Sequence, residues 1–141
     1  MVNTINGIQD EIIEEFDMLD DWLDRYQLII DYGKSLQPLP EEFRTPQNLI
    51  DGCQSQVWFV ASLQDVRVVY QADSDAILVK GIAALLLRVL NNQTPEEISE
   101  ADLYFIKRIG LQEHLSPTRS NGLAAMLRQM KLYALALLNK N

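Results

Sequence analysis

The chain has 141 residues, 48% of them hydrophobic and 23% charged, so it is long enough to bury a core of its own. Twelve basic and twenty acidic residues leave a net charge of −8, which disfavours nucleic acid and anionic membranes as partners. A single cysteine cannot form an internal disulfide, and we expect a cytoplasmic protein in a reducing compartment. The N-terminus lacks the basic and apolar regions of a signal peptide, and the apolar run 76–90 is too short and too charged to span a bilayer.

Two amphipathic helices are predicted in the N-terminal quarter. Hydrophobic residues recur at spacings of three and four from Ile5 to Leu19, which is typical of a helix with one buried face. A second helix in DDWLDRYQLIIDYGKSL should end near Gly33. Its predicted apolar side comprises Trp22, Leu23, Tyr26, Ile29 and Ile30. We interpret the many acidic residues of this region as a solvated face, with a docking surface for a basic partner as the weaker alternative.

A proline-rich connector and a β-hairpin are predicted next. Pro38, Pro40 and Pro46 indicate an extended connector. The segments QVWFVASL and VRVVYQA are rich in β-branched and aromatic residues and predict an antiparallel hairpin. Gln64 and Asp65 between them form a poor two-residue turn, because neither favours positive φ as glycine does. We therefore expect a loop of more than two residues.

A mostly buried helix is predicted over DSDAILVKGIAALLLRVL. Asp73, Ser74 or Asp75 should cap its N-terminus, because short polar side chains accept hydrogen bonds from the first turn. Gly81 lies in the middle of this helix, where glycine costs stability. We expect it to permit close contact with a strand.

The C-terminal third predicts further helices. TPEE at 94–97 is a capping box with proline at the first helical position. Ser99 and Asp102 indicate a second helix start, and Gly110 a stop. A long final helix follows in SPTRSNGLAAMLRQMKLYALALL. With no linker or repeat, residues 1–141 predict one α+β domain with a small antiparallel sheet packed against helices.

The usual motifs for phosphate and metal binding are missing from the sequence. Neither G-x-x-x-x-G-K-[ST] nor G-x-G-x-x-G occurs. Zinc and iron sites normally draw three or four ligands from Cys and His, and this chain offers only Cys53 and His114. This argues against an iron–sulfur cluster held within one subunit. A Cys53–His114 pair for thiol hydrolysis is an alternative, although nothing local supports contact between the two.

Cys53 has unusual neighbours for a core residue. A lone cysteine is often buried filler. Here Gly52 precedes it, polar Gln54, Ser55 and Gln56 follow it, and the predicted strand begins only after them. The glycine gives a loop freedom and gives the thiol steric access, so the pattern favours a reactive thiol over a structural one.

Four blocks of sequence resemble the SufE family. They are LIDGCQSQVWFVA, DSDAILVKGIAALLL, TPEEI and GLQEHLSPTRSNGLAAML, and they occur in the family's order and near its spacing. The similarity runs from about Trp22 to the C-terminus, although the hairpin turn lacks the glycine of many relatives. The resemblance implies a fold like that of IscU-type iron–sulfur scaffold proteins, with a sheet of three strands packed against helices.

The resemblance also implies a function. SufE-like proteins accept sulfur from a PLP-dependent, SufS-like cysteine desulfurase during iron–sulfur cluster biogenesis, so Cys53 would carry the sulfur as a persulfide to a scaffold protein. PLP belongs to the desulfurase, and this chain needs no cofactor or metal. We therefore expect an accessory protein that stimulates a desulfurase and is itself no enzyme, as a monomer or weak dimer. A cluster scaffold and a Cys53–His114 thiol hydrolase are the alternatives.

Supporting residues for Cys53 follow from the same blocks. Arg119 matches the arginine of the block HLSPTRSNGL and would contact the partner or stabilise a sulfur anion, with a salt bridge at a helix start as the alternative reading. Asp75 is either a helix cap or a neighbour of the cysteine loop. Gly52 would serve as a pivot for a thiol that is tucked in at rest, and Gln54 would support it.

Three other features have weaker assignments. We expect His114 and Asn121 to stabilise the loop between helices, with partner contact as the lesser alternative. The apolar run from Val57 to Val60 is expected to provide a sheltered wall for a persulfide.

Overall fold

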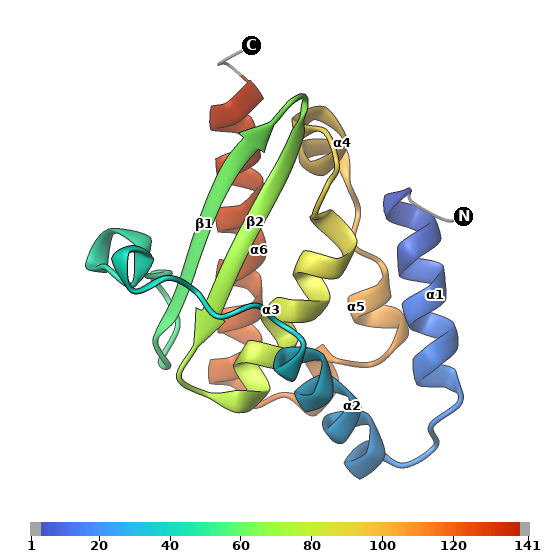
Figure 1. The fold of residues 1–141 in the computed structure, drawn as a ribbon. Helices are drawn as coiled ribbons and strands as arrows, with labels where there is room; N and C mark the ends of the chain where they lie inside the picture. The colour runs from blue at the N-terminus through green and yellow to red at the C-terminus, as the bar shows by residue number, and fades with distance from the viewer. Residues whose placement is uncertain (1–3, 139–141) are drawn as a thin grey trace.

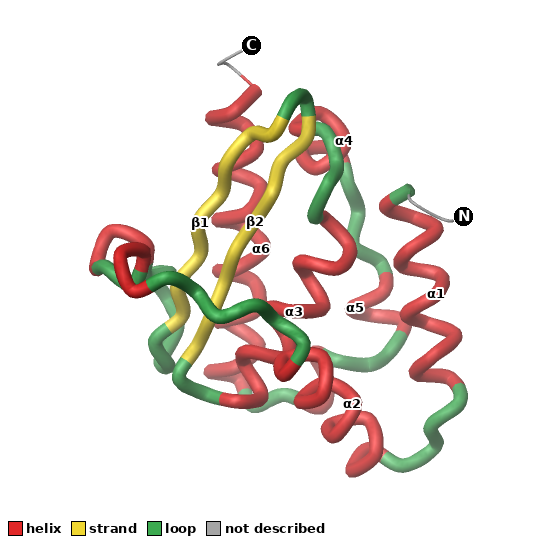
Figure 2. The backbone as a smooth tube through the Cα atoms, viewed as in Figure 1, coloured by secondary structure: helices red, strands yellow, loops and turns green. Residues whose placement is uncertain are grey.

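The structure is a computed structural model that describes residues 4–138. Its elements are α1 (Ile5–Asp17), α2 (Trp22–Lys34), η1 (Glu41–Phe43), η2 (Pro46–Asn48), β1 (Val57–Gln64), β2 (Arg67–Ser74), α3 (Ile77–Leu90), α4 (Pro95–Glu100), α5 (Phe105–Arg108), η3 (Gln112–His114) and α6 (Pro117–Leu138). One antiparallel hairpin packs against helices, which confirms the predicted α+β class (Figures 1 and 2).

Helix α3 lies at the centre of the fold. Its apolar residues Ile82, Leu85, Leu86, Val89 and Leu90 are all buried, as expected for a helix that is covered on most sides. The hairpin packs on α3 through β2 and on α6 through β1. Helix α2 covers another side of α3, and α1 packs against α3 and α5 (Figure 1).

Gly81 is required by the approach of α2, and the predicted contact with a strand is wrong. A Cβ atom at Gly81 would lie 2.1 Å from the carbonyl oxygen of Ile29, and a Cβ at Gly33 would lie 2.8 Å from the Gly81 nitrogen. Both distances are far below van der Waals contact, so the two glycines allow the backbones of α2 and α3 to meet.

The start of α3 also differs from the prediction. The residue before its first turn is Ala76, and no side chain caps it. Asp73 and Ser74 belong to β2, and the Asp75 carboxylate accepts a hydrogen bond from the Gln56 N–H instead. None of the three polar residues of the DSD motif therefore caps α3, although the Ser74 hydroxyl accepts from the Ala76 N–H at 3.2 Å.

The predicted capping box of α4 is confirmed, and the predicted start of the next helix is wrong. The Thr94 hydroxyl accepts from the Glu97 N–H at 3.2 Å, and the Glu97 carboxylate accepts from the Thr94 N–H at 3.1 Å. Ser99 lies inside α4, and α5 begins only at Phe105. Gly110 has a φ of 73°, which agrees with the predicted helix stop.

The hairpin turn is shorter than predicted. Gln64 pairs with Arg67, so the loop contains only Asp65 and Val66. Asp65 takes a φ of 57°, a conformation that aspartate tolerates better than most residues because its side chain can bond locally. The expectation of a longer loop is therefore wrong.

The sheet contains two strands within residues 4–138, whereas the resemblance implied three. Isolated bridges flank the strands, from Leu49 to Trp58 and from Val68 to Gln93. The connector before β1 contains the short helical turns η1 and η2 and is therefore not extended throughout, as the prolines had suggested.

The two N-terminal helices are confirmed, with one wrong assignment on the second. Ile12 and Phe16 of α1 are buried, and so is Ile29 of α2, but Leu23 is 74% exposed and does not belong to the apolar side. Part of the acidic character has structural roles. Glu15 lies 2.8 Å from Arg88 of α3, and Asp21 accepts from the Leu23 N–H as the cap of α2.

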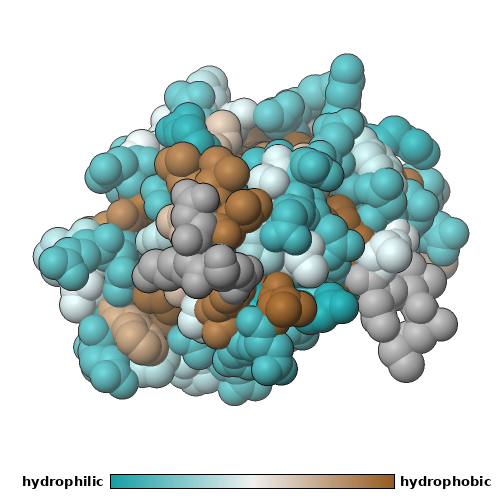
Figure 3. Space-filling model, turned by 90° about the horizontal axis from the view of Figure 1, so that it is seen from above, coloured by the Kyte–Doolittle hydropathy of each residue, from teal (hydrophilic) through white to brown (hydrophobic). Residues whose placement is uncertain are grey.

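The face of the molecule seen in Figure 3 is mostly hydrophilic, with apolar side chains gathered near the C-terminal end of α6. Within residues 4–138, no helix has the length and apolar character needed to cross a bilayer.

Candidate functional site

Cys53 lies in a short loop whose two ends are fixed to neighbouring elements. On one side, the Ile50 N–H donates to the Val57 carbonyl at 2.9 Å. On the other side, the Gln56 N–H donates to the Asp75 carboxylate at 3.1 Å, and the Asp75 N–H returns a bond to the Gln56 carbonyl at 3.2 Å. These bonds hold the base of the loop that carries Cys53.

The predicted pivot, Gly52, has the backbone conformation that such a role needs. Its φ of 92° lies in a region that side chains disfavour, and a Cβ there would lie 3.4 Å from Cβ of Ala125 in α6. The backbone conformation beside the thiol therefore favours glycine, whereas the packing alone would admit a Cβ.

The half-buried thiol of Cys53 opens into a cavity of about 250 Å³. The cavity is lined by residues of the loop, of α3 and of the start of α6, namely Cys53, Gln54, Ser55, Val79, Ile82, Ser116, Thr118, Arg119, Gly122 and Met126. The apolar wall comes from the two helices. The expectation that the run from Val57 to Val60 forms that wall is wrong, because none of those residues lines the cavity.

Gly122 is a site residue that the sequence analysis did not identify. The Cys53 thiol lies 3.7 Å from the Gly122 carbonyl oxygen, to which it donates, and a Cβ at Gly122 would lie 3.4 Å from the sulfur. A glycine inside the final helix was the available signal, because glycine in a helix costs about 1 kcal/mol and calls for a packing reason.

Burial raises the pKa of the Cys53 thiol. The thiol is therefore mainly protonated near neutral pH, and its reactivity as a nucleophile is reduced while it stays in the cavity. This agrees with the expectation of a thiol that is tucked in at rest.

Arg119 lines the same cavity and is exposed to solvent. Its backbone N–H donates to the Ser116 hydroxyl at 3.3 Å, which caps the start of α6. Its guanidinium forms no ion pair with any carboxylate of residues 4–138, so the alternative reading of a salt bridge finds no support there. The structure thus brings Arg119 to the thiol from 66 residues further along the chain.

The other supporting residues take different positions. Gln54 lines the cavity and is exposed. Asp75 does not line it, and acts on the loop through its two bonds to Gln56. Its reading as a neighbour of the cysteine loop is therefore the one that the contacts favour.

At the end of β2, the buried Asp73 forms an ionic cluster that no motif or residue spacing in the sequence indicated. Its carboxylate contacts Arg44 of the connector and lies 3.2 Å from Lys80 of α3. Burial alone would raise its pKa, but the Ser74 N–H and the two cations outweigh that effect, so the pKa is lowered. Arg44 also lies over the Trp58 ring, at 5.1 Å. The cluster joins three segments that surround the cysteine loop.

His114 lies in a separate setting. Its ring stacks on Trp22 at 3.7 Å, and its Nδ1 lies 2.9 Å from the Gly110 carbonyl oxygen. These contacts stabilise the segment before α6, as expected, and His114 is not among the residues that line the cavity of Cys53. Asn121 is exposed within α6 and not in the loop before it.

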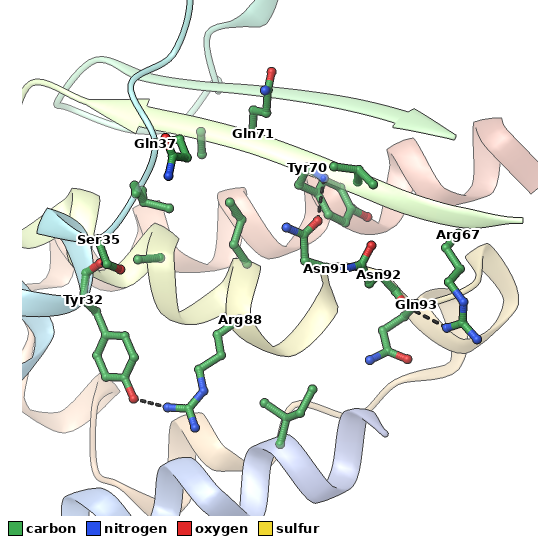
Figure 4. A pocket seen from close by; sticks show the side chains of 16 residues that line it. Tyr32, Ser35, Gln37, Arg67, Tyr70, Gln71, Arg88, Asn91, Asn92 and Gln93 are labelled. Carbon is green, nitrogen blue, oxygen red and sulfur yellow. Dashed lines mark hydrogen bonds between the residues drawn. The ribbon is translucent and has the colours of Figure 1, made fainter. Parts of the chain in front are cut away.

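The geometry gives no support to a metal centre within the described chain, because residues 4–138 contain no group of three Cys, His, Asp or Glu placed to hold an ion. A larger cavity of about 850 Å³ lies elsewhere, between β2, α3 and the end of α2. Figure 4 shows Arg88 directed toward Tyr32 along its floor. This larger cavity has no cysteine in its lining, and the guanidinium of Arg88 is already paired with Glu15.

Comparison with known proteins assigns the family. Residues 10–134 match the family described as "SufE: Fe-S metabolism associated domain". An uncharacterized SufE-like protein of Synechocystis is 44% identical over 126 residues, covering 89% of this chain and 79% of that protein. Another from Rhizobium meliloti is 41% identical over 127 residues, covering 86% and 91%.

Two further relatives extend the comparison. SufE-like protein 1, chloroplastic/mitochondrial, of Arabidopsis thaliana is 43% identical over 128 residues, which is 90% of this chain and 34% of that longer protein. The solution structure of a hypothetical protein from Thermus thermophilus superimposes with a TM-score of 0.78 at 25% identity, covering 94% of this chain and 96% of that one. The chain therefore belongs to the SufE family, whose domain is associated with iron–sulfur metabolism.

Proposed function

We propose that the protein accepts sulfane sulfur on Cys53 from a PLP-dependent cysteine desulfurase and passes it on for iron–sulfur cluster assembly. The observation that carries the proposal is a lone thiol that opens into a small cavity, in a loop with fixed ends, with Gly52 before it in the chain and Gly122 of α6 against its sulfur. Membership of a family associated with iron–sulfur metabolism supports it.

The transfer is a thiol–disulfide type of exchange. The Cys53 thiolate attacks the outer sulfur of a persulfide on the desulfurase, a new S–S bond forms on Cys53, and the donor cysteine leaves as a thiolate. The Cys53 proton passes to water, and no net oxidation occurs. The step needs an accessible thiolate and alignment of three sulfur atoms, and the desulfurase's PLP provides the earlier cleavage of cysteine.

The resting geometry suits a carrier that must be protected between transfers. Inside the cavity the thiol is held by the Gly122 carbonyl and its pKa is raised, so unwanted reactions are slow. For transfer the loop must turn outward about Gly52, which exposes the sulfur to the donor. Arg119 at the rim would then meet a carboxylate of the partner or the developing sulfur anion.

In this account the protein is an accessory factor that stimulates the desulfurase by removing its persulfide. It needs no cofactor of its own, acts as a monomer or weak dimer in the cytoplasm, and delivers sulfur to a scaffold protein. The position of His114 does not favour the thiol hydrolase, and the ligand positions of residues 4–138 do not favour the cluster scaffold.

The proposal is tested by measuring sulfide release by a purified cognate desulfurase with L-cysteine, with and without this protein. The wild-type chain should stimulate turnover, and Cys53→Ser should bind the desulfurase but give no stimulation. Equal stimulation by the Cys53→Ser protein would exclude Cys53 as the acceptor. Matching melting temperatures of the two proteins serve as the control for folding.

A further inference from the structure

The solvent face of α6 is unusually apolar for a surface helix. A groove of about 410 Å³ runs between this face and the segment that contains α5 and η3. Its apolar lining includes Ile106, Leu123, Leu127, Leu132 and Leu135. Leu132 and Leu135 are 50% and 48% exposed, although they lie on a helix with fully buried leucine and methionine positions elsewhere. They lie near the end of α6 around which Figure 3 shows apolar side chains.

The groove also differs in charge from the rest of the molecule. The chain carries a net charge of −8, but its groove residues include Arg128 and Lys131 and no Asp or Glu. The whole of α6 contains no acidic residue. Lys107 and Arg108 of α5 add exposed positive charge nearby, with Glu113 as the one acidic residue from 105 to 114. Arg128 has no ion-pair partner within residues 4–138.

The groove lies on the opposite side of α6 from the thiol. Residues on a helix are separated by about 100° in projection. Gly122 and Met126, which line the Cys53 cavity, therefore face away from Ala124, Arg128 and Leu135, which line the groove. An occupant of the groove would leave the cysteine loop free.

We propose that this groove, the α6 groove, binds an acidic amphipathic helix of a partner protein. The stretch from Ala124 to Leu135 rises by roughly 16 Å, which corresponds to about three turns of a bound helix. Leucines on one side of that helix would cover Leu132 and Leu135, and Glu or Asp on its flanks would face Arg128. Lys131 adds positive charge beside it, although its ammonium already donates to the Ala101 carbonyl oxygen at 2.5 Å. A second copy of α6 does not meet this requirement, because it would bring like charges together.

The chemistry of the groove is tested with two synthetic helical peptides and the full chain. Both peptides carry leucines at i, i+3, i+4 and i+7. One has glutamate at the flanking positions, and the other has lysine at the same positions. Fluorescence anisotropy gives the affinities, and amide chemical shifts locate the binding site. The glutamate peptide should bind at least tenfold more tightly than the lysine peptide and shift the amides of α6.

Matched variants locate the effect. Leu132→Asp should lower the affinity for the glutamate peptide at least tenfold, because it places a carboxylate in the apolar groove opposite the acidic flanks of the peptide. Leu23→Asp is the control, because Leu23 is exposed on α2 and outside the groove. It should leave the affinity unchanged, and both variants should keep the wild-type melting temperature.

Four results would overturn the proposal. The first is no binding of the glutamate peptide, and the second is equal binding of the two peptides. The third is self-association in sedimentation experiments that Leu132→Asp abolishes, since the occupant would then be a second copy. The fourth is movement of α6 amides with phosphatidylserine vesicles but not with the glutamate peptide, which would indicate a lipid surface. None of these experiments involves Cys53, so their outcome is independent of sulfur transfer.

Discussion

At the scale of single residues, the site depends on how tightly α6 approaches the thiol. The Gly122 position has room for a hydrogen atom and, at the limit, a methyl group, since a Cβ there would already lie 3.4 Å from the Cys53 sulfur. Space for one further sulfur atom must come from the adjoining cavity of about 250 Å³. A side chain larger than that of alanine at this position would therefore compete with the thiol for the same space.

Gly122→Val should displace the cysteine loop, because its two methyl groups extend into the position of the thiol. We expect iodoacetamide to alkylate Cys53 on the order of tenfold faster, because the displaced thiol is accessible and loses the burial that raises its pKa. Ala124→Val is the matched control, since Ala124 is exposed on the other face of α6. Equal alkylation rates in the two variants would show that Gly122 does not control access to the thiol.

Burial of Cys53 predicts a specific dependence of its reactivity on pH. Because the pKa of the thiol is raised in the folded protein, the thiolate forms at higher pH than in the unfolded chain. A profile of alkylation rate against pH should therefore have a higher midpoint for the folded protein than for the same protein in urea. This comparison is clean because Cys53 is the only cysteine of the chain. A midpoint equal to or below that of the unfolded chain contradicts the buried resting state.

Arg119 should act on the partner and not on the fold. Arg119→Ala removes an exposed guanidinium that has no ion pair within the described chain, so we expect the free energy of unfolding to change by less than about 1 kcal/mol. Desulfurase stimulation should fall while the alkylation rate of Cys53 stays unchanged. Faster alkylation would mean that Arg119 restrains the cysteine loop. If stimulation and alkylation both match wild type, Arg119 has no role in the site.

At the scale of elements, the contact between α2 and α3 depends on two glycines that lie against each other, Gly33 and Gly81. Gly81→Ala tests it. Alanine gains about 1 kcal/mol in helix propensity. Its Cβ, however, would lie 2.1 Å from the Ile29 carbonyl oxygen, which is part of the backbone and cannot easily move.

The clash should outweigh the gain, so we expect net destabilisation of roughly 2 kcal/mol in urea unfolding. Thr94→Ala serves as a reference variant, because loss of the capping box of α4 should lower the free energy of unfolding by about 1 kcal/mol. A Gly81→Ala protein as stable as wild type would mean that α2 and α3 do not approach as closely as described.

The same elements show what the sequence could and could not predict. The capping box at Thr94 and the stop at Gly110 were predictable, because their hydrogen bonds and backbone angles are set within a few residues. The partner of Gly81 was not, because it lies on α2 and is brought close only by the folded core. The Asp65 turn was missed because we expected a positive φ only from glycine, whereas aspartate also tolerates that conformation.

The residues of the candidate site also fall into those that the sequence could predict and those that it could not. The importance of Cys53 was visible from its polar neighbours and from the SufE-like blocks. That Arg119 and Gly122 line its cavity follows from α6 packing beside the loop, which no local pattern indicates. Asp73 was interpreted as a helix cap because its partners, Arg44 and Lys80, lie on two other segments that only the fold brings to it.

At the scale of the whole molecule, the Cys53 cavity and the α6 groove lie on opposite faces of one helix. The thiol lies between the cysteine loop, α3 and the start of α6, while the α6 groove lies on the other face of α6. The strongly acidic N-terminal helices contribute caps and ion pairs, such as Glu15 with Arg88, and not the site itself.

The central claim is that Cys53 carries sulfur, and the mass of the intact protein tests it most directly. The protein is incubated without reductant with a cognate desulfurase and L-cysteine, then weighed and digested to locate the adduct. We predict added mass of one or more sulfur atoms on Cys53, removed by dithiothreitol and absent in the Cys53→Ser protein. An unmodified Cys53 while the desulfurase is turning over would contradict the account.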